Sequence, residues 1–255
     1  MSEAGAPTLA IGPDGVARIT LRRPRHLNRL HGEDLATLTA HFDRLRDDEH
    51  ARVLVLTGKG RAFSTGFHLG ELGPAAASAP LAFERMVDAL EALPLPTVAR
   101  LHGDVHGGAV DLALACDFRI GVTGMALRMP AARIGLHYYA SGLRRGVARL
   151  GLQAAKRLFL LAEVLDAPTL LAMGYLDQLV APDDLDAAVD RLSDTLAANA
   201  PLAVRGMKRA LGDLAAGRDD PAAITAAQAR CADSEDLREG LAALAERRPP
   251  RFEGR

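Results

Sequence analysis

The chain has 255 residues, 49% of them hydrophobic and 25% charged, which suffices for a sizeable core in one large domain or in a domain with an appendage. Its formal net charge is -1 and its basic residues form no long run, so neither a nucleic-acid backbone nor an anionic membrane surface is an expected partner. No apolar run approaches the roughly 20 residues of a membrane helix, and residues 1–13 lack the pattern of a secretion signal, so we expect a cytoplasmic location.

The first half of the chain alternates strand-like and helical segments. Residues 16–21 alternate apolar and polar positions, which is typical of a half-buried strand. The later predicted elements are, in chain order, a helix over 32–45, a strand over 52–57, a helix over 81–93, a strand over 97–101, a helix over 108–116 and a strand over 118–122. This alternation favours an α/β fold with a parallel sheet, in which ligands gather at the carboxyl ends of the strands.

Strands become rare after about residue 140. The predicted helices cover 143–150, 152–162, 168–173, 185–199, 202–216, 222–231 and 235–246. We therefore divide the chain into an α/β core, residues 1–195, and a C-terminal helical region, residues 196–255. The apolar faces of that region have little sheet to cover, so packing on another subunit is expected. The alanine-rich segment 74–80 is predicted to be a mobile loop.

The cysteines and histidines predict neither a disulfide framework nor a metal site. Cys116 and Cys231 lie far apart and lack metal-binding spacing. The eight histidines include no HExxH or HxH pair, so no metal ligand set is evident.

Two glycine turns, about forty residues apart, each follow a strand-like run. The first spans residues 61–69 and contains Gly66, and the second spans 102–111 and contains Gly107 and Gly108. Because both turns lie at the carboxyl ends of predicted strands, we expect them to lie together. Two loops could then aim backbone N–H groups at one point, which suits chemistry that gathers negative charge on an acyl oxygen.

These motifs resemble the crotonase superfamily, that is, the enoyl-CoA hydratase/isomerase family. The similar segments are 24–30, 62–67, 102–111 with Cys116 and Asp117 after it, 233–240 and 246–252. Together they span almost the whole chain and are specific as a set, whereas any single glycine motif is weak.

The resemblance implies a crotonase-like spiral of ββα units with a C-terminal trimerisation region, assembled as a homotrimer or a dimer of trimers. It also implies a lyase or isomerase of fatty acid metabolism that acts on an acyl-CoA thioester, with CoA as part of the substrate and no separate cofactor. The thioester oxygen would lie between the backbone N–H groups of Phe67 and Gly108, an oxyanion hole. Further positions expected around the substrate and its CoA moiety are Arg25, Ser64, Thr65, His68, Leu69, Ala131 and Tyr139.

The expected acid residues depart from the hydratase pattern. In the hydratases two glutamates hold a water molecule, and the resemblance aligns Asp111 with the first and Ala131 with the second. Alanine cannot transfer protons, and Asp111 is one methylene shorter than glutamate, where a misplacement of about 1 Å can cost on the order of a hundredfold in rate. Both departures argue against efficient hydration by the two-acid scheme.

Three functions therefore stay open. The protein could be a hydratase or isomerase that works with Asp111 alone, or a lyase similar to methylmalonyl-CoA decarboxylase, which carries a tyrosine at the position of Tyr138. It could also be an acyl-CoA binding protein that has lost the chemistry. Each side chain has a structural interpretation too: Asp111 near a helix N-terminus is favourable by about 0.3–1 kcal/mol, and Tyr138 and Tyr139 could simply pack.

Overall fold

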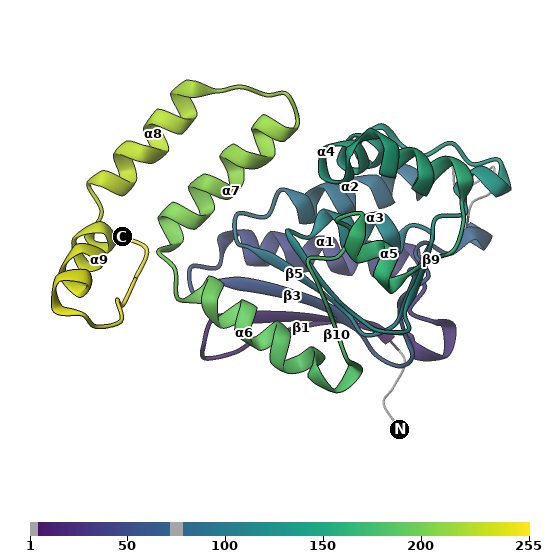
Figure 1. Cartoon of the computed structure of the whole chain (residues 1–255), viewed down its shortest axis with the longest axis horizontal. Coiled ribbons are helices and arrows are strands. Elements are labelled where there is room, and N and C mark those ends of the chain that lie inside the picture. Colours follow the sequence, from purple (N-terminus) through teal and green to yellow (C-terminus); the bar gives the residue numbers. More distant parts are fainter. Residues whose placement is uncertain (1–4, 72–78) are drawn as a thin grey trace.

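The computed structural model describes residues 5–71 and 79–255. Figure 1 shows a sheet covered by helices, with the last three helices extending away from it. The expected loop over 74–80 lies outside the described residues, except for Ala79 and Pro80, which begin a helix. None of the helices in the described ranges is long and apolar enough to cross a membrane.

The larger sheet has six strands. They are β1 (Gly5–Ile11), β2 (Val16–Arg22), β3 (Val53–Gly58), β5 (Thr97–Leu101), β7 (Phe118–Val122) and β10 (Gln178–Val180), and this is also their order in the sheet. β1 pairs with β2 in antiparallel fashion, and every other neighbouring pair is parallel. The central strand β3 begins with four buried apolar residues, Val53 to Leu56, because helices cover both faces of a parallel sheet.

A second, smaller sheet contains β4 (Ala62–Ser64), β6 (Asp104–His106), β8 (Ala126–Arg128) and β9 (Leu165–Asp166), in that order. Short turns connect β3 to β4, β5 to β6 and β7 to β8, and each of these pairs leads on to a helix. The chain therefore repeats a ββα unit. This arrangement confirms the predicted crotonase-like fold and brings the ends of β4 and β6 side by side.

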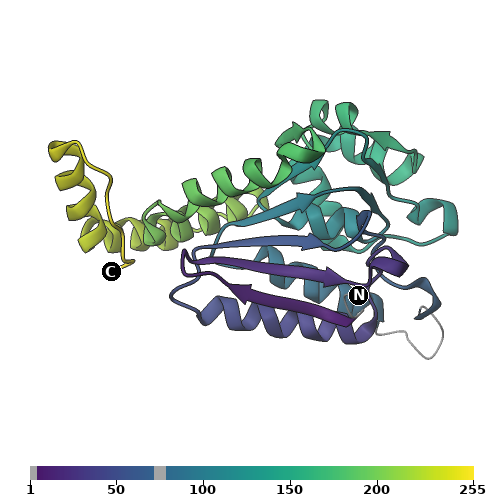
Figure 2. The same ribbon diagram turned by 90° about the horizontal axis from the view of Figure 1, so that it is seen from below.

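The helices follow the predicted pattern closely. They are α1 (Gly32–Asp47), α2 (Ala79–Glu91), α3 (Ala109–Ala115), α4 (Ala140–Lys156), α5 (Ala167–Ala172), α6 (Leu185–Ala197), α7 (Pro201–Ala215), α8 (Pro221–Ala232) and α9 (Glu235–Glu246). The predicted break between 150 and 152 lies within α4, where Gly151 has φ 78° and kinks the helix. Figure 2 shows α1 on one face of the larger sheet and α6 on the other.

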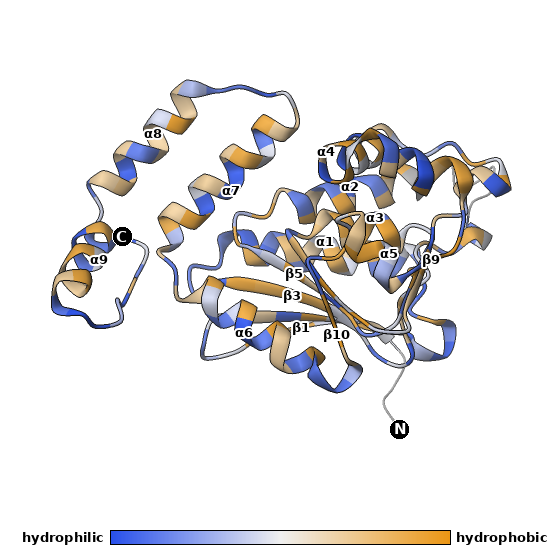
Figure 3. Ribbon diagram, in the orientation of Figure 1, coloured by the Kyte–Doolittle hydropathy of each residue, from blue (hydrophilic) through white to orange (hydrophobic). Residues whose placement is uncertain are grey.

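The core lies between the larger sheet and its helices. The apolar stripe that predicted α1, formed by Leu35, Leu38, Phe42 and Leu45, is fully buried. Figure 3 shows apolar residues along the central strands and, separately, along the C-terminal helices.

The C-terminal helices carry apolar side chains that this single chain leaves exposed. They are Met207, Leu211 and Leu214 on α7 and Leu237, Leu241 and Leu244 on α9. α7 still contacts the core, since the Lys208 ammonium lies 2.6 Å from the Asp117 carboxylate and donates to the Leu95 carbonyl. The proposed boundary at residue 195 falls in the last turn of α6, and the division into two regions stays a prediction.

Candidate active site

The first glycine turn follows β4 and is held by a buried serine. The Ser64 hydroxyl donates to the Asn28 carbonyl (2.7 Å) and accepts from the Gly66 amide (3.0 Å). Gly66 has φ 77°, in the left-handed region that glycine adopts readily. Next to it, the Leu30 amide donates to the Gly66 carbonyl and the His68 amide donates to the Leu30 carbonyl, both at 2.8 Å. These bonds fix the peptide on either side of Phe67.

Asn28 braces this turn, a role that the sequence analysis missed. Its side-chain amide donates to the carbonyls of Lys59 (2.7 Å), Ala62 (2.9 Å) and Phe63 (3.1 Å), and its oxygen accepts from the Arg23 amide. The residue is 1% exposed and has φ 53°, a conformation that asparagine tolerates better than most residues. Asn28 thereby ties the connection between β3 and β4 to the start of the first turn.

The second glycine turn follows β6 and leads into α3. Gly107 has φ 58°, and its amide donates to the Arg128 carbonyl on β8. Gly108 is the N-cap residue of α3, where amides have no intrahelical acceptor. The turn therefore presents the Gly108 amide away from its own helix.

The two turns touch through their backbones. A Cβ added to Gly66 would lie 2.4 Å from the Gly108 nitrogen and 2.7 Å from the Ala109 nitrogen, so only glycine fits without displacement. Neither the Phe67 amide nor the Gly108 amide donates a hydrogen bond to a residue within the described ranges. The two amides expected at the thioester oxygen thus lie on adjoining turns, and both are unused.

Asp111 lies one helical turn after Gly108, and its side chain is fully buried. Its Oδ2 accepts a hydrogen bond of 2.5 Å from the Tyr139 hydroxyl. Its Oδ1 lies 3.5 Å from Nε of Arg145, whose side chain is also fully buried. Burial raises the pKa of Asp111, and the Arg145 charge and the Tyr139 hydrogen bond only partly oppose that rise.

Tyr139, rather than Tyr138, contacts Asp111 directly. The Tyr138 hydroxyl donates to the Tyr139 hydroxyl (3.3 Å), and the two rings stack with centroids 4.3 Å apart. Gly142 on α4 leaves room for this packing, because a Cβ there would lie 2.4 Å from Cε1 of Tyr138 and 2.9 Å from Oδ2 of Asp111. Burial raises the pKa of both phenols, and the Asp111 charge adds to that effect, so both remain hydrogen-bond donors.

A chain of aromatic rings connects the glycine turns to Asp111. Phe83 of α2 is buried, and its ring centroid lies 6.2 Å from that of Phe67 and 6.3 Å from that of Tyr139. A Cβ on Gly108 would lie 2.7 Å from the Phe83 ring. The predicted oxyanion amides and the predicted acid therefore border one apolar wall.

The other predicted residues lie at different depths. Arg25 is exposed on the 3-10 turn Pro24–His26, and Leu69 is 51% exposed just after the first glycine turn. Thr65 is half-buried, and its amide donates to the Leu27 carbonyl. Ala131 is buried at the start of the 3-10 turn Ala131–Ile134.

His68 belongs to a cluster with His31 and Glu71, whose ligand atoms lie within 4.8 Å of one another and could approach a metal ion. The His31 ring already uses both nitrogens, since Nδ1 lies 2.6 Å from Oε1 of Glu71 and Nε2 accepts from Arg29. Burial alone would raise the pKa of Glu71, but the Gly32 amide and the two histidines lower it. We interpret the cluster as a hydrogen-bonded support for the first glycine turn.

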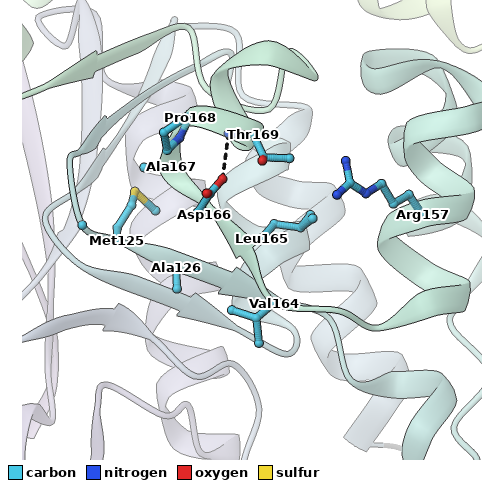
Figure 4. Close-up of a pocket in the computed structure, with 10 residues that line it drawn as sticks. Met125, Ala126, Arg157, Val164, Leu165, Asp166, Ala167, Pro168 and Thr169 are labelled. Carbon is cyan, nitrogen blue, oxygen red and sulfur yellow. Dashed lines mark hydrogen bonds between the residues drawn. The ribbon is translucent and has the colours of Figure 1, made fainter.

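A pocket of about 470 Å3 lies elsewhere, beside β8, β9 and α5 (Figure 4). Arg157 reaches toward it from the wide turn after α4, and Asp166 caps α5 by accepting from the Thr169 amide. None of the residues predicted for the active site lines this pocket. The pocket therefore has no place in the chemistry considered below.

Several known proteins are similar to this chain over almost its whole length. The chain matches the model of the enoyl-CoA hydratase/isomerase family over residues 12–255. It is 30% identical to (E)-benzylidenesuccinyl-CoA hydratase of Thauera aromatica over 250 residues, which cover 94% of this chain and 96% of the relative. It is also 30% identical to the enoyl-CoA isomerase/hydratase fer4 of Mycosarcoma maydis over 259 residues, with coverage of 94% and 93%.

Among solved structures, an enoyl-CoA hydratase/carnithine racemase from Magnetospirillum magneticum superposes with a TM-score of 0.93. The two sequences are 27% identical, and the match covers 99% of this chain and 97% of the other. The similarity therefore extends over the core and the C-terminal helices together.

Proposed function

The chain belongs to the enoyl-CoA hydratase/isomerase family, and from this premise we propose that it acts on an acyl-CoA thioester by stabilising an enolate between the amides of Phe67 and Gly108. The observation that carries the proposal is the contact between the two glycine turns, where Gly66 abuts the Gly108 nitrogen. Neither amide donates a hydrogen bond within the described part of the chain, so each is available to a ligand oxygen.

The proposed donors act through electrostatics. In the enolate, negative charge moves onto the thioester oxygen, and fixed amide dipoles stabilise that charge without having to reorganise. Removing one comparable donor costs about 2.7–4 kcal/mol of transition-state stabilisation. Every group that this chemistry uses belongs to the chain or to the substrate, so the proposal includes no cofactor other than the CoA moiety.

Asp111 is the proposed proton-transfer group. It borders the same aromatic wall as the two turns, and Tyr139 holds its carboxyl group in place. When ionised it can accept a proton from the carbon next to the thioester, and when protonated it can return that proton. Since alanine occupies position 131, we propose that one carboxyl group performs both transfers, which suits α-proton exchange and isomerisation better than hydration.

The test is exchange of the α-protons of butyryl-CoA in D2O, followed by proton NMR. We expect the wild-type protein to exchange these protons and Asp111→Asn to lose exchange. Asp43→Asn is the matched control, because Asp43 is an exposed α1 residue paired with Arg46. Full exchange by Asp111→Asn would remove Asp111 from the mechanism.

A lyase is the second candidate function, and the paired tyrosines favour it. A decarboxylase needs donors for the enolate oxygen and no base to start. The Tyr138 hydroxyl, whose bond to Tyr139 is 3.3 Å long, could donate to a substrate carboxylate instead and orient it. This function predicts CO2 release from malonyl-CoA or methylmalonyl-CoA and a strong loss in Tyr138→Phe. Absence of CO2 release from both thioesters would eliminate it.

Binding without turnover is the remaining alternative, motivated by Ala131. It predicts that acyl-CoA raises the melting temperature of the protein while neither α-proton exchange nor CO2 release occurs. Binding accompanied by either reaction would exclude it.

We also propose that the chain assembles with copies of itself as a homotrimer or a dimer of trimers. The exposed leucines of α7 and α9 support this proposal, because a stripe of large apolar side chains in water favours association. Leu244, at 76% exposure, is the most exposed of them.

A further inference from the structure

Arg145 is a buried cation surrounded by carboxylates. It projects from α4, and its side chain is 0% exposed. Its two terminal nitrogens bond to Oδ1 of Asp88 on α2, at 2.8 and 3.5 Å. Its Nε lies 3.5 Å from Oε1 of Glu91 and 3.5 Å from Oδ1 of Asp111. One guanidinium group thus lies at ion-pair distance from three carboxylates.

The Nε atom of Arg145, which faces Asp111, makes no hydrogen bond within the described residues. Within the described ranges, Nε of Arg145 and Oδ1 of Asp111 are both buried and neither has a hydrogen-bond partner. They lie at ion-pair distance from each other, so their interaction is Coulombic. An interaction of this kind is strong where solvent is excluded, and it depends on every other charge that shares the guanidinium.

We propose that Arg145 is a positioning residue that holds the Asp111 carboxyl group and sets its charge state, and that Asp88 tunes this effect by competing for the same guanidinium. This inference rests on the function proposed above in one respect, namely that Asp111 is the proton-transfer group. Arg145 acts through Asp111, because its Nε lies 3.5 Å from Oδ1 of that residue.

The geometry predicts opposite effects for the two partners. Arg145 favours the ionised form of Asp111, so removing its charge makes Asp111 hold its proton to higher pH. Asp88 repels the ionised form and draws the guanidinium toward itself, so removing its charge makes Asp111 release its proton at lower pH. A purely structural role for either residue predicts no such opposition.

Several other titratable groups surround Asp111 and are the same in the wild type and in the Asp88 variant. On α4 and the residues before it, Tyr139 donates to Asp111 and Tyr138 donates to Tyr139. On α2, Glu91 adds a second repelling charge. The Tyr175 hydroxyl donates to the Val110 carbonyl and remains neutral, because burial raises its pKa. None of these groups changes in the Asp88 variant.

The experiment is a direct titration of Asp111 by 13C NMR, in protein labelled at the aspartate carboxyl carbon. The Asp111 signal is assigned by its loss in Asp111→Asn. Asp88→Asn keeps the shape and the acceptor oxygen, and the Asp88 side chain is 41% exposed, so this variant is expected to fold. Its Asp111 midpoint should move to lower pH than in the wild type.

Arg145→Met should move the same midpoint to higher pH, and Arg144→Gln is the matched control. Arg144 neighbours Arg145 on α4 and also pairs with Glu91, but it is 44% exposed and does not touch Asp111. If Arg145→Met does not fold, Asp88→Asn carries the test alone. An unmoved midpoint in Asp88→Asn, or a move to higher pH, would overturn the proposal.

The pH dependence of α-proton exchange separates this inference from the proposed function. If the NMR midpoint moves as expected and the rate profile moves with it, both stand. If the midpoint moves but the wild-type protein exchanges no protons, the proposed function fails and the role of Arg145 stands. If the protein exchanges protons and the midpoint does not move, the role of Arg145 fails and the proposed function stands.

Discussion

Replacing Gly66 by alanine should push the two glycine turns apart. Gly66 has φ 77°, and the left-handed conformation costs alanine about 1–2 kcal/mol. The new methyl group would lie 2.4 Å from the Gly108 nitrogen, a backbone atom that cannot rotate away. Overpacking of this kind costs about 1–3 kcal/mol. The free energy of unfolding should therefore fall by about 2–5 kcal/mol in total.

The same displacement should reduce activity. Moving the Gly108 amide away from the Phe67 amide removes one donor from the enolate oxygen, which corresponds to a loss of about 10²–10³ in rate. We expect this loss in the exchange of butyryl-CoA α-protons, measured at saturating substrate so that the rate constant of the bound complex is compared.

Gly217→Ala separates the clash from the backbone strain. Gly217 lies after α7 with φ 69°, and a Cβ there would meet nothing within 4 Å. In urea denaturation, the free energy of unfolding of this control should fall only by the backbone cost of about 1–2 kcal/mol. The control should keep the full rate of α-proton exchange. The reasoning is refuted if Gly66→Ala folds and exchanges protons as fast as Gly217→Ala.

Three further predictions address the supports of the site, the C-terminal region and the assembly. Asn28→Ala removes the four hydrogen bonds of this side chain, each worth about 0.5–1.5 kcal/mol. It should lower the free energy of unfolding by about 2–6 kcal/mol in urea titration, and an unchanged midpoint would contradict this role. The Arg248 guanidinium and the Arg251 amide lower the pKa of Glu239 from 4.5 to about 2. The ionised Glu239 therefore stabilises the fold above pH 4.5, and this contribution is lost as the pH falls toward 2. The free energy of unfolding of Glu239→Gln should depend less on pH than that of the wild type between pH 5 and 2.5. An identical pH dependence would contradict the stabilising role of Glu239. Leu244→Glu places a charge in the exposed apolar stripe and should shift the mass found by light scattering toward that of the monomer, whereas an unchanged mass would place the contact elsewhere.

Long, strongly periodic elements could be predicted from the sequence, and short ones could not. The strand over 118–122 and the helix over 235–246 match β7 and α9 residue for residue. The strands of the smaller sheet have two or three residues, too few to show an alternating pattern, so the sequence indicated one sheet where there are two. β1 was missed as well, because Gly5 and Pro7 interrupt its pattern.

The candidate site likewise contains features that the sequence predicted and features that depend on packing. The meeting of the two glycine turns followed from their places at the carboxyl ends of parallel strands. Arg145 could not be distinguished from Arg144 in sequence, since only the packing of α4 against α2 buries one and exposes the other. The choice between Tyr138 and Tyr139 as the partner of Asp111 likewise depends on how the chain enters α4.

The most direct test of the central claim is the infrared frequency of a thioester carbonyl bound to the protein. Butyryl-CoA labelled with 13C at that carbonyl gives a band that can be isolated by isotope difference. Two hydrogen bonds from the amides of Phe67 and Gly108 predict a band at lower frequency than in water, and a smaller shift in Gly66→Ala than in Gly217→Ala. A bound carbonyl that absorbs at its aqueous frequency in the wild-type protein would contradict the account.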